Sequence, residues 1–340
     1  GSDLDISFLT EPDAPQPDAA STLGQLLGRL PDRFTNVSRV LVATTPLLKF
    51  IDAPSGMDID LCINNRLGVR NSQLLQAYCG YDSRVRLLGR LVKDWARAHR
   101  LVGSADGYLN SYAYMLLVIH FLQQCSPPVV PNLQALSKKS IPVTDTKWGC
   151  EDLWQTKFVA GIDRLPASQN SSDLAELLVA FFHFYSAAFN WQEFAVCIRL
   201  NRHGVAVDKH SLCTPTSKDQ WYIEDPFDLK HNLARQCSAH ARTRISERMR
   251  ACLAELRATG SWAAACPVRN DHAFYLKCRI AAGVTPQRLL EGFLGFGLRK
   301  LHFPRPDASG RVGQAFLEFA SAAARRKAHT RNEARVGDCQ

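Results

Sequence analysis

The sequence has no C-x-x-C pair, although it contains eleven cysteines, at positions 62, 79, 125, 150, 197, 213, 237, 252, 266, 278 and 339. Zinc modules and small disulfide frameworks need paired, regularly spaced cysteines. The nearest approach to a zinc arrangement is His203, His210 and Cys213, which lack a partner cluster. We therefore expect no structural zinc, and we expect reduced thiols in a reducing compartment.

The sequence also has no run that is long and apolar enough to span a membrane. The longest apolar stretch, Leu174 to Trp191, contains Glu176, His183 and Asn190 and falls short of the ~20 apolar residues that a span requires. An Asn-Ser-Ser-Asp signal for a helix start precedes it, so we expect a buried helix. We find neither internal repeats nor a targeting peptide, and we expect no membrane partner.

Acidic residues are the minority of the charged ones, with 32 Asp and Glu against 41 Lys and Arg. Most of the cations are Arg, whose guanidinium pairs bidentately with phosphate, so the excess favours a phosphate-rich partner. A basic protein without such a partner has the same composition, and this alternative stays open. The 340 residues, 46% of them hydrophobic, suit a soluble globular chain of two domains, or of one domain with a large elaboration.

The first 66 residues indicate a small, strand-rich domain. Period-two alternation with β-branched residues predicts strands at 3–8, 38–51 and 57–63, and a short helix is expected at 21–30.

From about Gly68 the pattern is helical. One apolar stripe in residues 82–101 consists of Val85, Leu88, Leu91, Val92 and Trp95. Further expected elements are helices at 111–124, 174–189 and 234–257 and a strand at 194–200. Strands followed by helices predict an α+β fold with two lobes, 1–66 and 67–258, and residues 259–340 form an accessory C-terminal extension.

Two Asp-x-Asp stretches suggest chemistry, one with Asp3 and Asp5, the other with Asp58 and Asp60. Alternate residues of a strand share a face and lie ~6.5–7 Å apart, so two carboxylates repel unless a cation sits between them. A third carboxylate on a neighbouring strand would complete a two-Mg²⁺ site for phosphoryl chemistry. The pattern alone is weak, because solvated strand faces and turns often contain it.

Five segments in one order strengthen the case. They are DLCINNRLGVRNSQLLQAY, DSRVRLLGRLVKDWARAHRL, GYLNSYAYMLLVIHFLQ, PPVVPNLQ and YIEDPFDLKHNLAR. From Asp3 to about Arg235 the chain resembles the RNA terminal uridylyltransferases and their poly(A) polymerase relatives, members of the DNA polymerase β-like nucleotidyltransferase superfamily.

The resemblance implies a two-lobed nucleotidyltransferase with a mixed-sheet catalytic palm and a mainly helical nucleotide-recognition domain. It is greatest to the compact trypanosomatid enzymes, which include a mitochondrial, editosome-associated uridylyltransferase. A mitochondrial location, or otherwise a cytoplasmic one, and an editosome-like protein complex follow from the resemblance only.

By this resemblance, Asp3 and Asp5 bridge two Mg²⁺ or Mn²⁺ ions. The family's third carboxylate stands four residues before an Asn-Asn pair, which selects Asp60 as the ligand that helps to activate the RNA 3′ hydroxyl. Asp58 has no counterpart and is expected to be a rim carboxylate held by Lys, Arg or solvent. The family also places a Gly-Ser helix start about ten residues upstream. Here Ser2 abuts Asp3, so the chain as written is expected to lack one phosphate contact.

Four residues match family positions for the ribose and triphosphate. Asn71 and Ser72 match the ribose and phosphate contacts, and both also suit a helix N-cap, which is compatible with that role. Lys93 and Arg97, spaced i and i+4, match two triphosphate-binding lysines, and the second is Arg here. A solvated cationic face is the alternative.

Five further residues match positions around the base. Ser111 precedes Tyr112, which matches the aromatic that stacks on the nucleobase, while Tyr114 is the better candidate for the core. Asp225, Asp228 and His231 match positions at the base edge, where His favours uracil and obstructs purines. An ordinary core tyrosine at 112 and a capping or exposed imidazole at 231 are the alternatives.

We therefore expect a template-independent RNA uridylyltransferase that uses UTP, Mg²⁺ and a single-stranded RNA 3′ end. An adenylating enzyme of the same fold and a catalytically silent RNA-binding subunit are the alternatives. The Arg-rich stretch 241–250 and the tail 324–329 are candidates for RNA backbone contacts. The amphipathic segments 284–304 and 311–327 lie outside the resemblance and are expected to brace the lobes or bind a partner.

Overall fold

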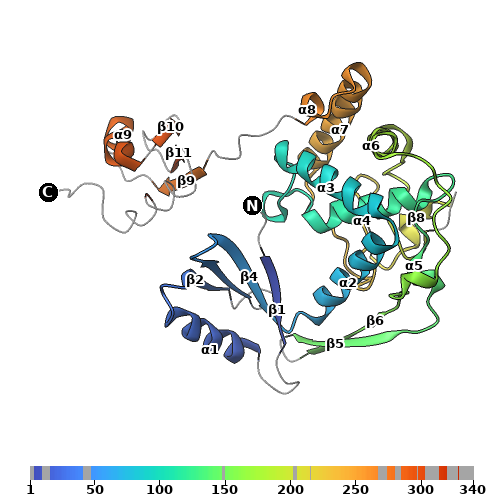
Figure 1. Cartoon of the computed structure of the whole chain (residues 1–340), viewed down its shortest axis with the longest axis horizontal. Helices are drawn as coiled ribbons and strands as arrows, with labels where there is room; N and C mark the ends of the chain where they lie inside the picture. The colour runs from blue at the N-terminus through green and yellow to red at the C-terminus, as the bar shows by residue number, and fades with distance from the viewer. Residues whose placement is uncertain are drawn as a thin grey trace. The chain divides into compact units, whose positions relative to one another are not determined.

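The computed structural model describes residues 4–9, 16–40, 47–147, 150–201, 205–214, 216–266, 274–279, 285–296, 298–302, 314–319 and 328. The chain forms two compact units, Gly1–Ala265 and Cys266–Gln340. The first contains a four-stranded sheet and a helical body, and the second contains a small sheet with the helix α9 (Figure 1). Mixed sheet and helices agree with the predicted α+β class.

The four-stranded sheet comprises β1 (Leu4–Phe8), β2 (Phe34–Val40), β3 (Leu47–Asp52) and β4 (Met57–Ile63), in the order β1-β4-β3-β2. Strands β1 and β4 are parallel, and the other pairs are antiparallel.

Apolar and acidic residues alternate along β4. Ile59, Leu61 and Ile63 are buried in the cluster that includes Ala20 of α1 (Gln16–Gly28). Because successive strand residues point to opposite faces, Asp58 and Asp60 belong to the other face. The hydrophobic pattern thus orients the carboxylates.

The predicted strands at 3–8 and 57–63 are confirmed as β1 and β4, but the single strand at 38–51 is wrong. Strands β2 and β3 pair antiparallel, so the chain reverses between them. Pro46, which cannot donate to a strand ladder, was the available signal of an interruption.

The helical body is built from the following elements. They are α2 (Arg66–Tyr81), α3 (Ser83–Ala98), η1 (Ser104–Asp106), α4 (Ser111–Gln124), α5 (Leu133–Leu136), η2 (Ile162–Arg164), α6 (Leu174–His183), the π-helical turn η3 (Phe184–Ala188), η4 (Lys209–Ser211), α7 (Ala239–Thr259) and α8 (Trp262–Ala265). Its core contains Trp95, which packs edge-on against Tyr114 and Phe182, with ring centroids 6.5 and 4.9 Å away. Asp173 and Glu176 form a capping box at the start of α6, as the Asn-Ser-Ser-Asp signal predicts.

Two features of this body differ from expectation. A hairpin of β5 (Ile141–Lys147) and β6 (Cys150–Thr156) was not predicted. The strand expected at 194–200 is limited to β7 (Phe194–Ala195), which pairs with β8 (Val207–Asp208). Beyond β7 the chain makes an isolated bridge from Val196 to Ile223, and the side chains of Cys197 and Arg199 donate hydrogen bonds to Glu224 of the neighbouring loop.

The second unit has β9 (Phe274–Arg279), α9 (Pro286–Phe293), η5 (Leu294–Phe296), β10 (Leu298–His302) and β11 (Gln314–Phe319). Its antiparallel sheet has the order β10-β11-β9. The expected amphipathic segment 284–304 contains both α9 and β10, and 311–327 contributes β11. No helix in the described part of either unit is both long and apolar enough to cross a membrane.

Candidate active site

Two of the predicted metal ligands meet across neighbouring strands. Asp5 of β1 is the register partner of Asp60 of β4. Adjacent strands lie ~4.8 Å apart and paired residues share a face, so the two carboxylates are neighbours. Asp58 belongs to the same face, but it is exposed and stands opposite Ile51 of β3. Ser2 and Asp3 lie outside the described residues.

A cation that the sequence analysis missed lies beside Asp60. Lys49 of β3 is the register partner of Asp60 on the other side, and its Nζ forms an ion pair with Asp60 Oδ2. Lys49 alternates with the buried Leu48 and Phe50, so a strand at 47–52 would have predicted it on the carboxylate face. The ammonium group shows that positive charge is stabilised at this point.

Asp5 and Asp60 fit a divalent ion such as Mg²⁺, because both offer hard carboxylate oxygens from rigid strands and lie close enough to repel each other. Burial raises the pKa of the nearby Cys62 thiol, and the charges of Asp5 and Asp60 raise it further. Within the described ranges no group of three His, Cys, Asp or Glu side chains is arranged to hold a metal, and Asp3 as the third ligand stays a prediction.

Lys93 of α3 lies within electrostatic reach of this face. Burial lowers its pKa, the positive charge of Arg97 lowers it further, and Asp94 and Asp5 act in the opposite direction. Lys93 and Arg97 are one helical turn apart and both are half-buried. Asp5 and Lys93, predicted to bind metal and triphosphate respectively, therefore lie within electrostatic reach of each other.

The predicted capping role of Asn71 and Ser72 is wrong. Helix α2 begins at Arg66, and its N-cap is Asn65, whose Oδ1 accepts a hydrogen bond from the Gly68 amide at 3.0 Å. Asn71 and Ser72 consequently lie inside the helix, where neither can cap it. Ser72 is exposed, whereas Asn71 belongs to a buried polar group.

Asn71, Tyr112 and Asp225 form that group. Asn71 Nδ2 donates to Asp225 Oδ2 at 3.3 Å, while Asn71 Oδ1 and the Tyr112 hydroxyl are buried without a hydrogen-bond partner. Burial raises the pKa of Tyr112 well above its usual value, and the Asp225 carboxylate raises it further. Buried polar atoms normally find partners, so these two atoms are available to a polar ligand.

Ser111 is the first residue of α4, directly after the N-cap Asn110, whose Oδ1 accepts from the Ala113 amide at 2.8 Å. Tyr114 is fully buried and donates to the Leu101 carbonyl at 2.9 Å, as expected for a core residue.

The loop that contains Asp225, Asp228 and His231 is a tight turn. Asp225 Oδ1 accepts from the amides of Phe227 and Asp228 at 2.9 and 3.0 Å. The His231 amide donates to the Asp228 carbonyl at 2.8 Å, and its side chain is exposed. Burial raises the pKa of Asp225, which these amides and His231 partly offset. The turn therefore places His231 at the surface above the buried Asp225.

Residues that the sequence analysis did not select stabilise this turn. Glu224 is buried and makes a fork with Arg199 through two hydrogen bonds of 2.8 Å, and Gln134 Nε2 donates to the Pro226 carbonyl at 2.9 Å. A single sequence contains no signal for such pairs, because Arg199 and Glu224 come from different segments. They are structural supports of the turn.

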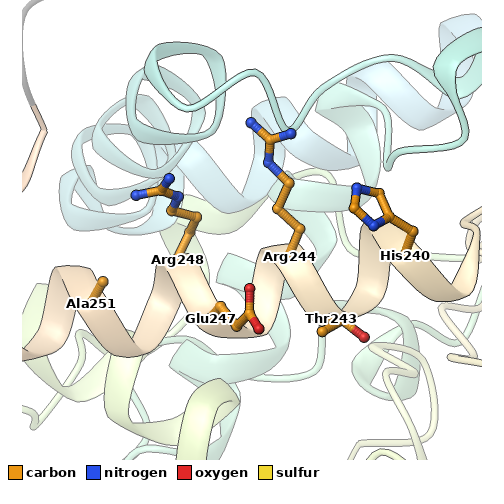
Figure 2. A pocket seen from close by; sticks show the side chains of 6 residues that line it. All are labelled: His240, Thr243, Arg244, Glu247, Arg248 and Ala251. Carbon is orange, nitrogen blue, oxygen red and sulfur yellow. The ribbon is translucent and has the colours of Figure 1, made fainter.

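The Arg-rich helix α7 borders a cavity. A cavity of about 520 Å³ is lined by His240, Thr243, Arg244, Glu247, Arg248 and Ala251. Figure 2 shows Arg244, Arg248 and His240 on the same side of the helix. Burial lowers the pKa of the nearby His99, and Arg248 and Arg244 lower it as well. A role of this surface in RNA contact stays a prediction.

A mixed sheet with facing carboxylates, next to a helical body that presents half-buried cations, is the arrangement expected of a nucleotidyltransferase. A family model described as the central palm domain of mitochondrial-like poly(A) RNA polymerase matches residues 1–80, and one described as Cid1 family poly A polymerase matches residues 173–231. The chain belongs to the Cid1 family of poly(A)/poly(U) polymerase nucleotidyltransferases.

Curated relatives include both activities. Terminal uridylyltransferase 7 of Homo sapiens is 34% identical over 209 residues, which is 58% of this chain and 13% of that protein. The mitochondrial poly(A) RNA polymerase of Homo sapiens is also 34% identical, over 64% of this chain and 35% of its own length. The chain thus spans a minor part of the curated relatives it matches.

Solved structures match more of the chain. Cid1 poly(U) polymerase with Mg and 3′-dATP aligns with a TM-score of 0.63 and 28% identity, over 77% of this chain and 78% of that one. A variant of mtPAP in complex with ATPγS aligns with a TM-score of 0.64 and 25% identity, over 77% and 57%. The predicted family and fold class are confirmed.

Proposed function

We propose that the protein is a template-independent RNA terminal uridylyltransferase, which transfers UMP from UTP to an RNA 3′ hydroxyl and releases pyrophosphate. One observation carries the proposal: Asp5 and Asp60 face each other within electrostatic reach of Lys93. Carboxylates that hold divalent ions beside cations that bind phosphate are what phosphoryl transfer needs.

In this mechanism Asp3, Asp5 and Asp60 would hold two Mg²⁺ or Mn²⁺ ions, in line with the Mg in a Cid1 structure. The bound ions would neutralise phosphate charge and activate the 3′ hydroxyl. Lys93 and Arg97 bind the triphosphate and stabilise the charge that builds up on pyrophosphate. Lys49 pairs with Asp60, and a divalent ion held by this carboxylate would compete with that ion pair.

Tyr112 stacks on the base, and the unpartnered Asn71 Oδ1 accepts a hydrogen bond from the ribose. Ser72 contacts phosphate, as its family position implies, and Ser2 would join it, while Ser111 contacts the nucleotide beside Tyr112. Asp225 holds Asn71 in place, while Asp228 and His231 lie at the base edge. Residues 1–66 would act as the palm, 67–258 as the nucleotide-recognition domain and 259–340 as an accessory extension.

His231 favours UTP over ATP in this proposal. A structure from the work on UTP selectivity in Cid1 holds a His-to-Asn variant bound to MgATP. The other candidate is adenylation, because the uridylyltransferase and the mitochondrial poly(A) polymerase of Homo sapiens are equally identical to this chain.

The test is extension of a labelled single-stranded RNA by each of the four nucleoside triphosphates with Mg²⁺. We expect UTP to give the longest products at equal concentration. Preference for ATP would establish the second candidate. No transfer with any nucleotide, in Mg²⁺ or Mn²⁺, would establish a catalytically silent subunit.

Single-stranded RNA is the proposed acceptor, in line with the ApU product bound in a Cid1 structure. A mitochondrial site of action is proposed on the mitochondrial poly(A) RNA polymerases of Homo sapiens and Mus musculus among the relatives. An editosome-like complex stays a prediction.

A further inference from the structure

The second unit has a topology of its own. Strand β9, helix α9, strands β10 and β11 and the helical residue Ala328 follow one another along the chain. In the strand order β10-β11-β9, the central strand β11 is antiparallel to both β9 and β10. Strands β9 and β10 are therefore parallel to each other, and the connection between them contains α9. Strands β9, β10 and β11 and helix α9 are the first four elements of the split β-α-β-β-α-β arrangement, and the helical residue Ala328 lies in the core of the unit.

The core of this unit lies on one face of the sheet. Ala315, Leu317 and Phe319 of β11 are buried together with Leu289 and Phe293 of α9. Helix α9 therefore packs on that face. Because strand residues alternate, Gln314, Phe316 and Glu318 occupy positions of the opposite face.

The strand register shows which residues of β9 and β10 share this opposite face with Gln314, Phe316 and Glu318. Phe316 pairs with Lys277 of β9 and His302 of β10, and Glu318 pairs with Tyr275 and Lys300. The next pair along the sheet is Gln314 and Arg279.

Tyr275 and Phe316 thus occupy diagonal positions on adjacent strands, ~7–8 Å apart. Three cationic positions surround them, at Lys277, Arg279 and Lys300, with one carboxylate position at Glu318.

The sequence of β11 supports the same interpretation. Residues 312–319, VGQAFLEF, match the K/R-G-F/Y-G/A-F-V-x-F/Y pattern of RNA-recognition sheets at Gly313, Ala315, Phe316 and Phe319, with Leu317 for Val. The pattern departs at Val312 and Gln314. Its alternation agrees with the structure, since Ala315, Leu317 and Phe319 are in the core.

We propose that this sheet face binds single-stranded RNA, with Tyr275 and Phe316 stacking on two bases and Lys277, Arg279 and Lys300 contacting phosphates. Stacking on a flat sheet requires unpaired bases, which excludes a duplex as the ligand. The cations complement the charge of the backbone. This site lies outside the proposed transfer site and does not depend on it.

The first experiment measures binding of a fluorescent 12-nucleotide oligouridylate to the full chain by anisotropy, with EDTA and without nucleotide. Phe316→Ala and Tyr275→Ala should each weaken binding about fivefold or more, and Phe316→Tyr should bind as wild type because it keeps the ring. Lys277→Gln should reduce the slope of log affinity against log salt by about 0.7. Arg288→Gln, on the exposed side of α9, is the matched charge control and should change neither quantity.

The second experiment locates the bound RNA directly and does not depend on a loss of binding in a variant. Wild-type protein is crosslinked by ultraviolet light to oligouridylate that contains 4-thiouridine, and the crosslinked peptides are identified by mass spectrometry. We expect crosslinks in peptides that contain Tyr275 or Phe316, also in the Asp60→Asn variant, which tests transfer and this site separately. Crosslinks confined to residues 1–265, or equal losses from Lys277→Gln and Arg288→Gln, would overturn the proposal.

Discussion

Replacing Asp60 by Asn separates the chemistry of the carboxylate face from its folding. The substitution keeps the shape of the side chain and removes one negative charge. Two terms change in the free energy of unfolding, and they oppose each other. The ion pair with Lys49 is lost, and it is worth ~0–1 kcal/mol because the Lys49 side chain is 50% exposed.

The second term is repulsion from Asp5 on the neighbouring strand. At ~5 Å, two unit charges repel by ~1–3 kcal/mol for effective dielectric constants between that of water and about 20. Asp5 is exposed, so the lower end applies. The two terms nearly cancel, and we expect the unfolding free energy of Asp60→Asn without metal to stay within about 1 kcal/mol of wild type.

Activity should respond very differently. A bound ion supplies several kcal/mol of transition-state stabilisation, and losing about 3 kcal/mol slows a reaction by about two orders of magnitude. We therefore expect kcat/KM for RNA extension to fall about 100-fold or more. The assay is gel analysis of labelled RNA with saturating Mg²⁺, accompanied by thermal denaturation of the same preparations.

Asp58→Asn is the matched control, because Asp58 belongs to the same face of β4 and is exposed. Its charge lies ~7 Å from Asp60 along the strand and acts through water, which amounts to about a threefold effect on rate. Equal losses in the two variants, or an Asp60→Asn enzyme with near wild-type rate, would refute the assignment of the third ligand.

Three further predictions concern the nucleotide site. His231→Asn should shift the preference from UTP towards ATP in competition assays while the Tm stays unchanged, because His231 is exposed; an unaltered preference would remove His231 from base selection. Lys93→Ala and Arg97→Ala should raise the KM for UTP about tenfold or more, since each removes a charge-assisted phosphate contact, whereas Arg90→Ala on the exposed side of α3 should leave it unchanged. Burial raises the pKa of Asp225 above 3.8 in the folded state, so its contribution to stability is present at low pH and is lost as pH rises through the raised pKa. Asp225→Asn should lack this decline in denaturant titrations between pH 4 and pH 7, and a decline equal to that of wild type would show that another group causes it.

The relation between sequence and structure differs from one part of the site to another. Alternation of apolar residues in 57–63 was enough to predict β4 and the shared face of Asp58 and Asp60, because the period of a strand is local. The Asn-Asn register singled out Asp60, and the structure places Asp60 beside Asp5. The same rule failed at 38–51, where one apparently continuous pattern belongs to two antiparallel strands, β2 and β3.

Helix capping is the second failure. Asn71 and Ser72 are good cap residues, yet Asn65 lies nearer the start of the apolar pattern and satisfies the Gly68 amide. Any of these polar residues can cap in isolation, and the end of β4 decides which one does. Asn71 is consequently free to bind Asp225, a partner distant in sequence.

By itself the sequence determined the family, the α+β class and the residue types of the site, because motifs, periodicity and charge are local properties of the chain. Only the tertiary structure decided which of these residues meet: Lys49 with Asp60, Asp5 near Lys93, and Asn71 with Asp225. It also decided that β9, β10 and β11 pair in one sheet, in a register that puts Tyr275 and Phe316 at positions of the same face. These pairings depend on strand register and helix packing between distant segments, and a single sequence contains no local signal for either.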